Sequence, residues 1–391
     1  MRRDPPHQRW SKQMTSWRPQ PFSTMARAQG RDSATIQNSI DAAQRLAEIT
    51  PNAEPIFTLK HLAHLTGAPY VLLRGIVSRH EPDPYRVFKI HKRPLPGEVT
   101  RFRTIVIPNQ SLMDVQRWIN VHILEHVKPH RASAAFTRGD SIKRAAERHC
   151  GARWLIKMDL RNFFESVTER QVYRVYLSIG YQPLVAFELA RLCTRVASSH
   201  ARLSRYHAPW GWKTIEGYRH PTMGHLPQGA PTSPKLANLV ARELDENLEQ
   251  LARSNGFVYT RYADDLTFST LGASSRCAVR SFIGDVSESI AQAGFTPNQA
   301  KTQVSPPGSR KVVLGLLVDR DEPRLSREFK SQLRQHLFYL KRHGASAHAS
   351  RQGSATIFGL RRHILGLIQH ARQIEEQYGN SQLKSFKELH W

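Results

Sequence analysis

The sequence predicts an α/β fold in which hairpins of short strands, with acidic residues at their ends, alternate with helices. Three observations support this prediction. Trp154 to Asp159 is a mostly apolar run, typical of a buried strand, that ends in a carboxylate. Phe257 to Tyr262 and Leu266 to Ser269 are the two arms of a hairpin whose turn carries the acidic pair Asp264-Asp265. Residues 324 to 391 are basic and have the apolar spacing of amphipathic helices.

The region before the strand at Trp154–Asp159 is predicted to contain both helices and strands. Residues 1 to about 35 are rich in Arg, Gln, Pro and Ser, and we expect them to be poorly ordered. A helical pattern begins near Ser39 and ends at Pro51, and residues 59 to 71 indicate another helical segment. Tyr85 to Ile107 reads as two strands joined by a turn rich in Pro and Gly. Further helices are predicted for Ser111–His126 and Ser141–His149 before the Trp154–Asp159 strand, and for Phe163–Tyr176 and Pro183–Arg195 after it.

The region after these helices contains a long irregular stretch, residues 197 to 224, that is rich in His, Arg, Tyr and Trp. A structureless loop of that length in a compact domain is usually functional or disordered. A helix is expected to follow through Leu248, and another from Val279 to Ala293. Val312 to Val318 is predicted to be a short strand.

The charge of the chain indicates a polyanionic partner. Lys and Arg total 57 against 32 Asp and Glu, a formal net charge of +25, and the commonest partner for such a protein is nucleic acid. No apolar run approaches the roughly 18 to 20 residues that span a bilayer, so we expect no membrane partner. No secretory signal is evident either. The three cysteines are far apart in the sequence, which fits a reducing cytoplasm.

Three carboxylates carry the predicted chemistry. Taken singly, Asp159 is typical of a turn or helix cap, and Asp264 and Asp265 of a solvated turn. Brought together they would repel one another unless a cation compensates their charge. Their hard oxygens suit Mg²⁺, with Mn²⁺ as a substitute. Two such ions about 3.5 to 4 Å apart can stabilise the attacking and leaving oxygens of a phosphoryl transfer.

Five motifs, in a fixed order, resemble those of reverse transcriptases, and the bacterial retron group is the most similar. Tyr262-Ala263-Asp264-Asp265 resembles the family's Tyr-x-Asp-Asp box. The other four segments that resemble family motifs are Asp159–Phe164, Leu226–Pro234, Gly294–Thr302 and Leu314–Asp319.

Three departures from the retron pattern leave the subclass open, and one of them is that the stretch from 197 to 224 looks expanded. The sequence has Ala145 where the group has Asn before His149, and Val313-Leu314-Gly315 where the group has Val-Thr-Gly. A group II intron-like or another defence-associated bacterial enzyme therefore remains an alternative.

The resemblance implies a role for each matching residue. The metal ligands would be Asp159, Asp264, Asp265 and the backbone of Leu160. Lys301 would protonate pyrophosphate or neutralise its charge. The residues that would bind the incoming dNTP are Arg103, Leu160, Phe163, Phe164, Gln228 and Gly229.

Each of these side chains also has a structural interpretation. Phe164 would exclude a ribose 2′-hydroxyl and so favour deoxynucleotides, but it could instead be a core aromatic. Gln228 could be a turn residue, Lys301 a surface lysine, and Arg103 an exposed strand residue that does not clamp a triphosphate.

The resemblance implies a right-hand polymerase: fingers, a palm built on an antiparallel sheet, and a helical thumb. The expected parts are a basic extension (1–50), fingers (51–150), a palm (151–319) with a finger-like insertion near 197–235, and a basic thumb (320–391). In the thumb, Leu360, Ile364, Leu367 and Ile368 would form one apolar face, while basic residues would follow phosphates.

The predicted function is an RNA-directed DNA polymerase that copies a structured noncoding RNA into DNA in antiphage defence. The noncoding RNA would serve as template and primer, its DNA product would remain joined to it, and an effector protein from the same locus is an expected partner. An RNA-binding scaffold with a degenerate palm is the non-enzymatic alternative. An RNA-templated RNA polymerase is disfavoured by Phe164, whereas a self-priming polymerase would need the same residues.

Overall fold

The computed structural model describes residues 17–79, 83–91, 102–196, 223–353, 356–389 and 391. The chain forms two compact units that interleave along the sequence. The first unit comprises residues 1–130 and 162–242, and the second comprises 131–161 and 243–391. The turn expected near residue 95 and almost all of the irregular stretch 197–224 lie outside the described residues.

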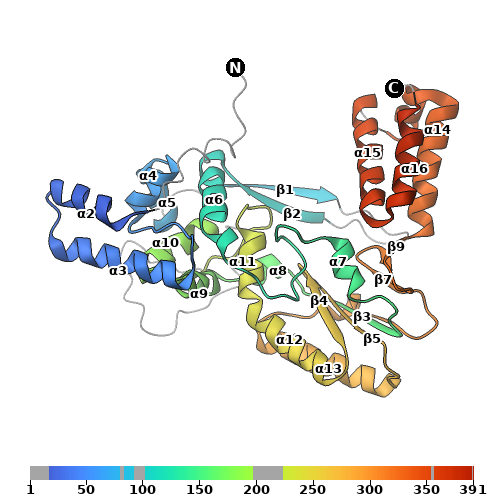
Figure 1. Ribbon diagram of the computed structural model, residues 1–391, viewed down its shortest axis with the longest axis horizontal. Helices are drawn as coiled ribbons and strands as arrows, with labels where there is room; N and C mark the ends of the chain where they lie inside the picture. Colours follow the sequence, from blue (N-terminus) through green and yellow to red (C-terminus); the bar gives the residue numbers. More distant parts are fainter. Residues whose placement is uncertain (1–16, 80–82, 92–101, 197–222, 354–355, 390) are drawn as a thin grey trace. The chain divides into compact units, whose positions relative to one another are not determined.

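The first unit is mainly helical and carries one strand hairpin (Figure 1). Strands β1 (Tyr85–His91) and β2 (Phe102–Pro108) pair antiparallel, which confirms the predicted hairpin. The helices of this unit are α2 (Pro19–Ala28), α3 (Ser33–Ile49), α4 (Leu59–Thr66), α5 (Tyr70–Ser78), α6 (Gln110–His122), the 3₁₀ turn η1 (Leu124–His126), α8 (Phe163–Ser166), α9 (Glu169–Ile179), α10 (Pro183–Cys193) and α11 (Ser233–Val240).

The N-terminal region is more helical than predicted. Pro19 opens α2 at a position where its missing N–H is not needed. The carboxylate of Asp32 accepts a hydrogen bond from the backbone N–H of Thr35 and caps α3, which therefore begins at Ser33 and not near Ser39. The expectation of poor order is thus wrong for residues 19 to 35, because composition does not register these local helix-start signals.

The helix predicted for Phe163–Tyr176 is also wrong, because it is two helices. The break lies at Thr168, which caps α9. The backbone N–H of Thr168 donates to Gln171 Oε1 at 2.8 Å, and the backbone N–H of Gln171 donates to Thr168 Oγ1 at 3.4 Å. This reciprocal pair is a capping box, which starts a new helix and ends α8 at Ser166.

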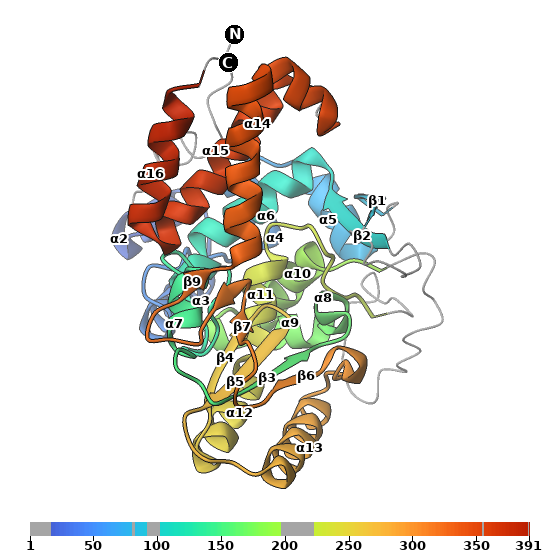
Figure 2. The ribbon, with the colours of Figure 1, turned by 90° about the vertical axis from the view of Figure 1, so that its right-hand side faces the viewer.

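The second unit is built on a four-stranded antiparallel sheet in the order β4-β5-β3-β6 (Figure 2). Its strands are β3 (Trp154–Asp159), β4 (Val258–Tyr262), β5 (Asp265–Thr270) and β6 (Gln303–Ser305). The strand β3 and the β4–β5 hairpin are confirmed as predicted.

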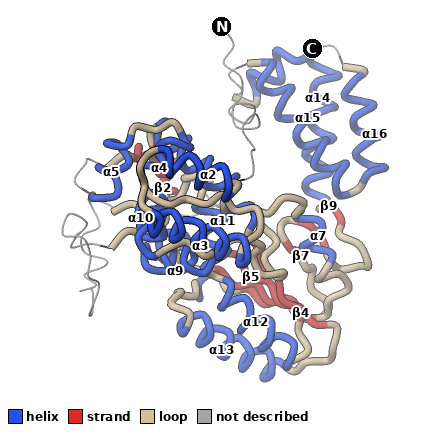
Figure 3. The backbone as a smooth tube through the Cα atoms, turned by 60° about the vertical axis from the view of Figure 1, so that its left-hand side comes forward, coloured by secondary structure: helices blue, strands red, loops and turns tan. Residues whose placement is uncertain are grey.

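Two long helices, α12 (Arg242–Ser254) and α13 (Arg276–Gln292), lie on one face of this sheet (Figure 3). The ring of Phe282 on α13 stacks on Phe257 at 4.3 Å between centroids and packs edge-on against Phe268 of β5 at 5.3 Å. The short helix α7 (Ile142–Glu147) and the 3₁₀ turn η3 (Gln299–Lys301) complete this part of the unit.

The rest of the second unit is a small sheet followed by helices. The expected strand at Val312–Val318 is instead a hairpin of β7 (Val312–Val313) and β8 (Leu316–Leu317), because Leu314 and Gly315 turn the chain with positive φ. Strand β9 (Arg324–Leu325) pairs with β8. The helices that follow are α14 (Arg327–Arg351), α15 (Ile357–Ile374) and α16 (Glu376–Lys387).

The predicted apolar face of the C-terminal helices is confirmed. Leu360, Ile364 and Ile368 are fully buried and Leu367 is partly buried in one hydrophobic core. No helix among the described residues is long and apolar enough to cross a membrane.

Candidate active site

The three predicted carboxylates meet at one end of the four-stranded sheet. Asp159 is the last residue of β3, and it pairs directly with Asp265, the first residue of β5. Asp265 also pairs with Tyr262 across the hairpin, so Asp264 lies in the two-residue turn between them. Residues directly opposite in antiparallel strands have Cα atoms about 4.5 to 5.5 Å apart. The sheet register therefore brings together carboxylates more than a hundred positions apart in the sequence.

The turn that carries Asp264 has an uncommon backbone conformation. Ala263 has a φ of 57°, in the left-handed region that favours glycine. A positive φ at the first of the two turn residues is a feature of type II′ hairpin turns, which suit the twist of antiparallel strands. Holding an alanine there costs roughly 1 to 3 kcal/mol, so neighbouring contacts must stabilise the turn.

Those contacts come from a buried ion pair on the helix-covered face of the sheet. The Arg261 guanidinium donates to the Asp245 carboxylate from Nε at 2.8 Å and from a terminal nitrogen at 2.6 Å. Its other terminal nitrogen donates to the carbonyl of Ala263 at 3.0 Å. The Tyr259 hydroxyl donates to the same carboxylate at 2.8 Å. A side chain of α12 thus fixes the backbone of the acidic turn.

A buried histidine supports the opposite face of the same hairpin. One ring nitrogen of His149 lies 2.7 Å from the Ser269 hydroxyl and the other lies 2.7 Å from the Thr260 hydroxyl. Burial, with a smaller contribution from the charge of Arg148, lowers the pKa of His149 to about 3. A neutral imidazole therefore links β4 and β5 near neutral pH.

Electrostatics in the acidic cluster favour a cation. Desolvation and the negative charges of Asp264 and Asp159 raise the pKa of Asp265. The Lys301 ammonium already lies 2.6 Å from Asp159 Oδ1, and the side-chain amide of Asn298 donates to Asp159 Oδ2 at 2.9 Å. The cluster thus consists of hard oxygen donors with an excess of negative charge, and a positive group is drawn to it.

These donors fit a divalent metal ion that shares its ligands with a substrate. Within the described parts of the chain, no three His, Cys, Asp or Glu side chains form a ready metal cage. Mg²⁺ is usually held by one or two carboxylates, waters and substrate phosphates rather than by an all-protein cage. Asp159, Asp264 and Asp265 match that kind of donor set.

Backbone hydrogen bonds fix the segment that follows Asp159. The N–H of Leu160 donates to the Asp264 carbonyl at 2.9 Å, and the N–H of Arg161 donates to Thr296 at 2.9 Å. The N–H of Asn298 donates to the Asp159 carbonyl at 2.7 Å. The side chain of Leu160 is buried, so only its backbone is placed for a role at the site.

In the first unit, the structure brings Gln228 and Gly229 against the β1–β2 hairpin. The backbone N–H of Val106 donates to the Gln228 carbonyl at 2.7 Å. Gly229 has a φ of 126°, and a Cβ at this position would lie 2.8 Å from the Val106 carbonyl. Only glycine fits there. Arg103 lies on β2, as Val106 does, is exposed, and pairs with Ile90 of β1.

The two predicted phenylalanines differ in exposure. Phe163 is buried, whereas Phe164, the expected sugar gate, is half-buried. Their rings lie 5.6 Å apart in the short helix α8. These residues, with Arg103, Gln228 and Gly229, belong to the first unit, whereas the carboxylates and Lys301 belong to the second.

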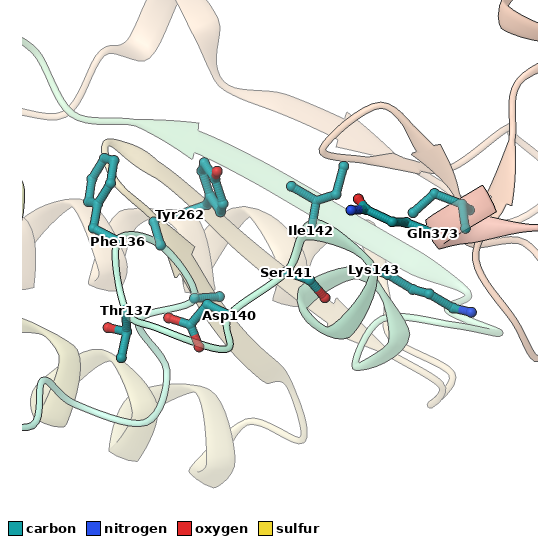
Figure 4. A pocket seen from close by; sticks show the side chains of 11 residues that line it. Phe136, Thr137, Asp140, Ser141, Ile142, Lys143, Tyr262 and Gln373 are labelled. Carbon is teal, nitrogen blue, oxygen red and sulfur yellow. The ribbon is translucent and has the colours of Figure 1, made fainter. Parts of the chain in front are cut away.

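A cavity of about 550 Å³ adjoins the acidic hairpin within the second unit (Figure 4). The rings of Phe136 and Tyr262 lie together at one end of it, with centroids 6.4 Å apart. Phe136 is 45% exposed and has a φ of 66°, an uncommon conformation for a bulky residue. The other side chains that line the cavity include Thr137, Asp140, Ser141, Ile142, Lys143 and Gln373.

Asn298, Asp245, Arg261 and His149 are the site residues that sequence reasoning missed. Asn298 lies inside a segment already matched to a motif, three residues before Lys301, so its position was a usable signal. A weaker indication of the ion pair was an arginine between Tyr259 and Tyr262 in a strand that otherwise contains Val, Tyr and Thr.

A family described as reverse transcriptase (RNA-dependent DNA polymerase) matches residues 90–320, which is more than half of the chain. The chain belongs to this family. Retron Ec86 reverse transcriptase from Escherichia coli is 30% identical over 305 residues, which cover 78% of this chain and 85% of that protein. Retron Ec83 reverse transcriptase, also from Escherichia coli, is 27% identical over 81% of this chain and 93% of its own length.

A third relative is matched over only part of its length. Retron Mx162 reverse transcriptase from Myxococcus xanthus is 36% identical over 244 residues, and the match covers 59% of this chain and 48% of the relative. The chain therefore spans about half of that reverse transcriptase. The predicted bacterial retron-type reverse transcriptase, an RNA-directed DNA polymerase with an α/β fold, is confirmed. Reverse transcriptases generally use divalent metal ions and an RNA template, and they produce DNA.

Proposed function

We propose that this reverse transcriptase copies a structured noncoding RNA into DNA by two-metal nucleotidyl transfer at Asp159, Asp264 and Asp265. The observation that carries the proposal is the direct pairing of Asp159 with Asp265 at the end of the sheet, beside the turn that presents Asp264. Retron relatives that are 27 to 36% identical over 59 to 81% of the chain support the choice of RNA-copying chemistry.

The three carboxylates and the backbone of Leu160 would hold two Mg²⁺ ions, with Mn²⁺ as a substitute. When bound, these ions supply charge stabilisation for the primer 3′-oxygen, the triphosphate and the departing pyrophosphate. Asp159 and Asp265 would hold an ion together because the sheet register places them directly opposite each other. Lys301 donates a proton to the pyrophosphate or neutralises its charge.

The first unit would provide the contacts to the incoming dNTP. Gly229 lets the 226–234 loop run against β2, which positions Gln228 for the nucleotide. Arg103 would bind the triphosphate, the backbone near Phe163 would line its site, and the half-buried ring of Phe164 would exclude a 2′-hydroxyl.

We propose that the chain is divided as a right-hand polymerase is. A basic extension (1–50) precedes the fingers (51–150), the palm (151–319) with its insertion near 197–235, and the thumb (320–391). Exposed basic residues on the C-terminal helices support contact with phosphates. The cavity beside Tyr262 would take a nucleotide near the reacting primer end, since Phe136 and Tyr262 offer aromatic surfaces there.

We also propose a biological role for the enzyme. The noncoding RNA from the same locus would be template and primer, and the product would be an RNA–DNA molecule of the msDNA type. The protein would act in the bacterial cytoplasm in antiphage defence, with an effector protein from its locus.

The test is to purify the wild-type protein and the Asp264→Asn variant from the native locus and to sequence the nucleic acid that co-purifies. Asp285→Asn, which changes an exposed aspartate on α13, is the matched control. We expect a discrete RNA joined to its complementary DNA in the wild type and the control. Loss of several kcal/mol of transition-state stabilisation should lower DNA synthesis by Asp264→Asn by about 10³-fold or more.

Other outcomes would change the proposal in defined ways. RNA without linked DNA, but with extension of an added primer, would keep the polymerase and remove the retron substrate. Equal DNA yield from Asp264→Asn and Asp285→Asn would refute the catalytic assignment.

A further inference from the structure

The two oxygens of the Asp159 carboxylate have different kinds of partner. Oδ1 accepts from the Lys301 ammonium at 2.6 Å, and Oδ2 accepts from the side-chain amide of Asn298 at 2.9 Å. The Asp159 side chain is only 9% exposed, whereas that of Lys301 is 51% exposed. One oxygen is therefore held by a neutral group and the other by a charged group that borders solvent.

Asn298 is fixed relative to Asp159 by the backbone. Its N–H donates to the Asp159 carbonyl at 2.7 Å, and its own carbonyl accepts from the N–H of Lys301 at 3.0 Å. The next residues form η3 and then β6, which pairs with β3 at Lys157 and Gln303. The Asn298 amide can therefore leave Oδ2 only by a side-chain rotation into a poorer position.

Lys301 is not fixed in this way. Its ammonium is at the end of a four-carbon stem with many accessible rotamers, and half of the side chain is in solvent. When the Lys301 ammonium leaves, it recovers its hydration, and the buried Asp159 carboxylate keeps its hydrogen bond from Asn298. The Lys301 ammonium can thus leave Oδ1 without disturbing the fold.

We propose that Asn298 is a positioning residue that turns Oδ1 of Asp159 toward the metal site, and that Lys301 is a resident counter-cation displaced from Oδ1 when the divalent ion binds. The displaced ammonium is then available for the triphosphate. This inference rests on the proposed role of Asp159 as a metal ligand.

The two residues consequently have opposite effects on metal affinity. Asn298 favours the metal, because a hydrogen bond to the second oxygen orients a carboxylate ligand. Lys301 opposes it, because a singly and a doubly charged cation repel each other at one carboxylate oxygen. A role that is merely structural for both residues would change metal affinity in the same direction.

The test is Mn²⁺ binding to the full chain without RNA or nucleotide, with free Mn²⁺ measured by electron paramagnetic resonance. Asp159→Asn defines the binding that is unrelated to the site. Asn298→Ala should weaken binding by about tenfold. Lys301→Ala should tighten it by up to about fivefold, the fold-change that corresponds to losing a weak interaction with a half-exposed cation. The matched control is Gln299→Ala, which changes the exposed neighbouring amide.

A second measurement separates the two roles in turnover. DNA synthesis by Asn298→Ala should recover at high Mn²⁺ concentration, because only affinity is lost. Synthesis by Lys301→Ala should stay low at saturating metal, because the proton donor is missing.

The outcomes distinguish this inference from the proposed function. If Asp159→Asn binds Mn²⁺ as the wild type does, the proposed metal site itself fails. If Asp159→Asn loses binding but Lys301→Ala binds no more tightly than the wild type, the counter-cation role is overturned. If Asn298→Ala matches Gln299→Ala, the positioning role is overturned. Should Asn298→Ala not fold, Asn298→Ser is measured in its place and the Lys301→Ala arm stands alone.

Discussion

Two carboxylate–cation pairs lie on opposite faces of the same sheet and differ in how deeply their cations are buried. Asp245 and Arg261 are both 0% exposed and are joined by two short hydrogen bonds. Asp159 and Lys301 are joined by one, and the lysine is half in solvent. Strand residues alternate between faces, so Arg261 and Asp265 point in opposite directions from adjoining strands. The buried Arg261 therefore stays paired with Asp245, whereas the half-exposed Lys301 can leave Asp159.

The difference follows from desolvation. A buried charge that loses its partner cannot recover hydration, so neither Asp245 nor Arg261 can be released. The Lys301 ammonium is half in solvent and recovers its hydration when it leaves, and the buried Asp159 carboxylate keeps its hydrogen bond from Asn298, so this pair opens at a smaller cost than the buried one. The sheet thus has a rigid pair beneath the acidic turn and a replaceable cation beside it.

The largest expected effect comes from breaking the buried pair. Asp245→Asn should lower the free energy of unfolding by about 3 to 5 kcal/mol, because it removes the charge of the carboxylate that pairs with the buried Arg261 guanidinium. Urea unfolding of the full chain measures this change. Glu246→Gln, an exposed acidic neighbour on α12, should change it by less than about 0.5 kcal/mol. Similar values for the two variants would contradict the assigned rigidity.

A smaller effect is expected from pH through His149. Its pKa is about 3 in the folded protein and 6.5 when unfolded, so the unfolded state binds more protons between these values. Stability is therefore fully present above pH 6.5 and is lost as pH falls toward 3. From pH 7 to 5 the loss should be about 2 kcal/mol.

The pH effect is isolated by comparison between variants. His149→Gln should lose that part of the pH dependence, whereas His343→Gln, at an exposed position, should keep it. An unchanged pH slope in His149→Gln would show that the buried imidazole is not the group that titrates.

The smallest expected effect is on the exchangeable pair. Lys301→Ala should change the free energy of unfolding by less than about 1 kcal/mol, because the lost ammonium is half in solvent and Asp159 keeps its hydrogen bond from Asn298. Urea unfolding measures it alongside Asp245→Asn. A loss as large as that of Asp245→Asn would make Lys301 a structural residue and remove the contrast between the two pairs.

Local patterns in the sequence predicted the strands of the site but not all of its helices. The run Trp154–Asp159 is apolar and short, and its strand has the predicted bounds. The start of α3 at Ser33 and the break at Thr168 depend on single capping residues, which a periodic pattern does not reveal.

The long-range contacts were beyond the reach of sequence reasoning. Asp245 is an ordinary acidic residue in the first turn of a helix until the fold places it under Arg261. Asn298 reaches Asp159 only because β6 pairs with β3. Such pairings join segments without any shared local pattern, so family motifs pointed to Asp159, Asp264 and Asp265 but not to the residues that contact them.

The position of β3 between β5 and β6 has a consequence for synthesis of the chain. The strand leaves the ribosome more than a hundred residues before either neighbour. At about 5 to 20 residues per second, it waits roughly 5 to 20 s with both hydrogen-bonding edges open. We therefore expect nascent chains that end before Thr270 to be recognised by chaperones and to be cut readily by protease. Protection should begin only when the β4–β5 hairpin has emerged.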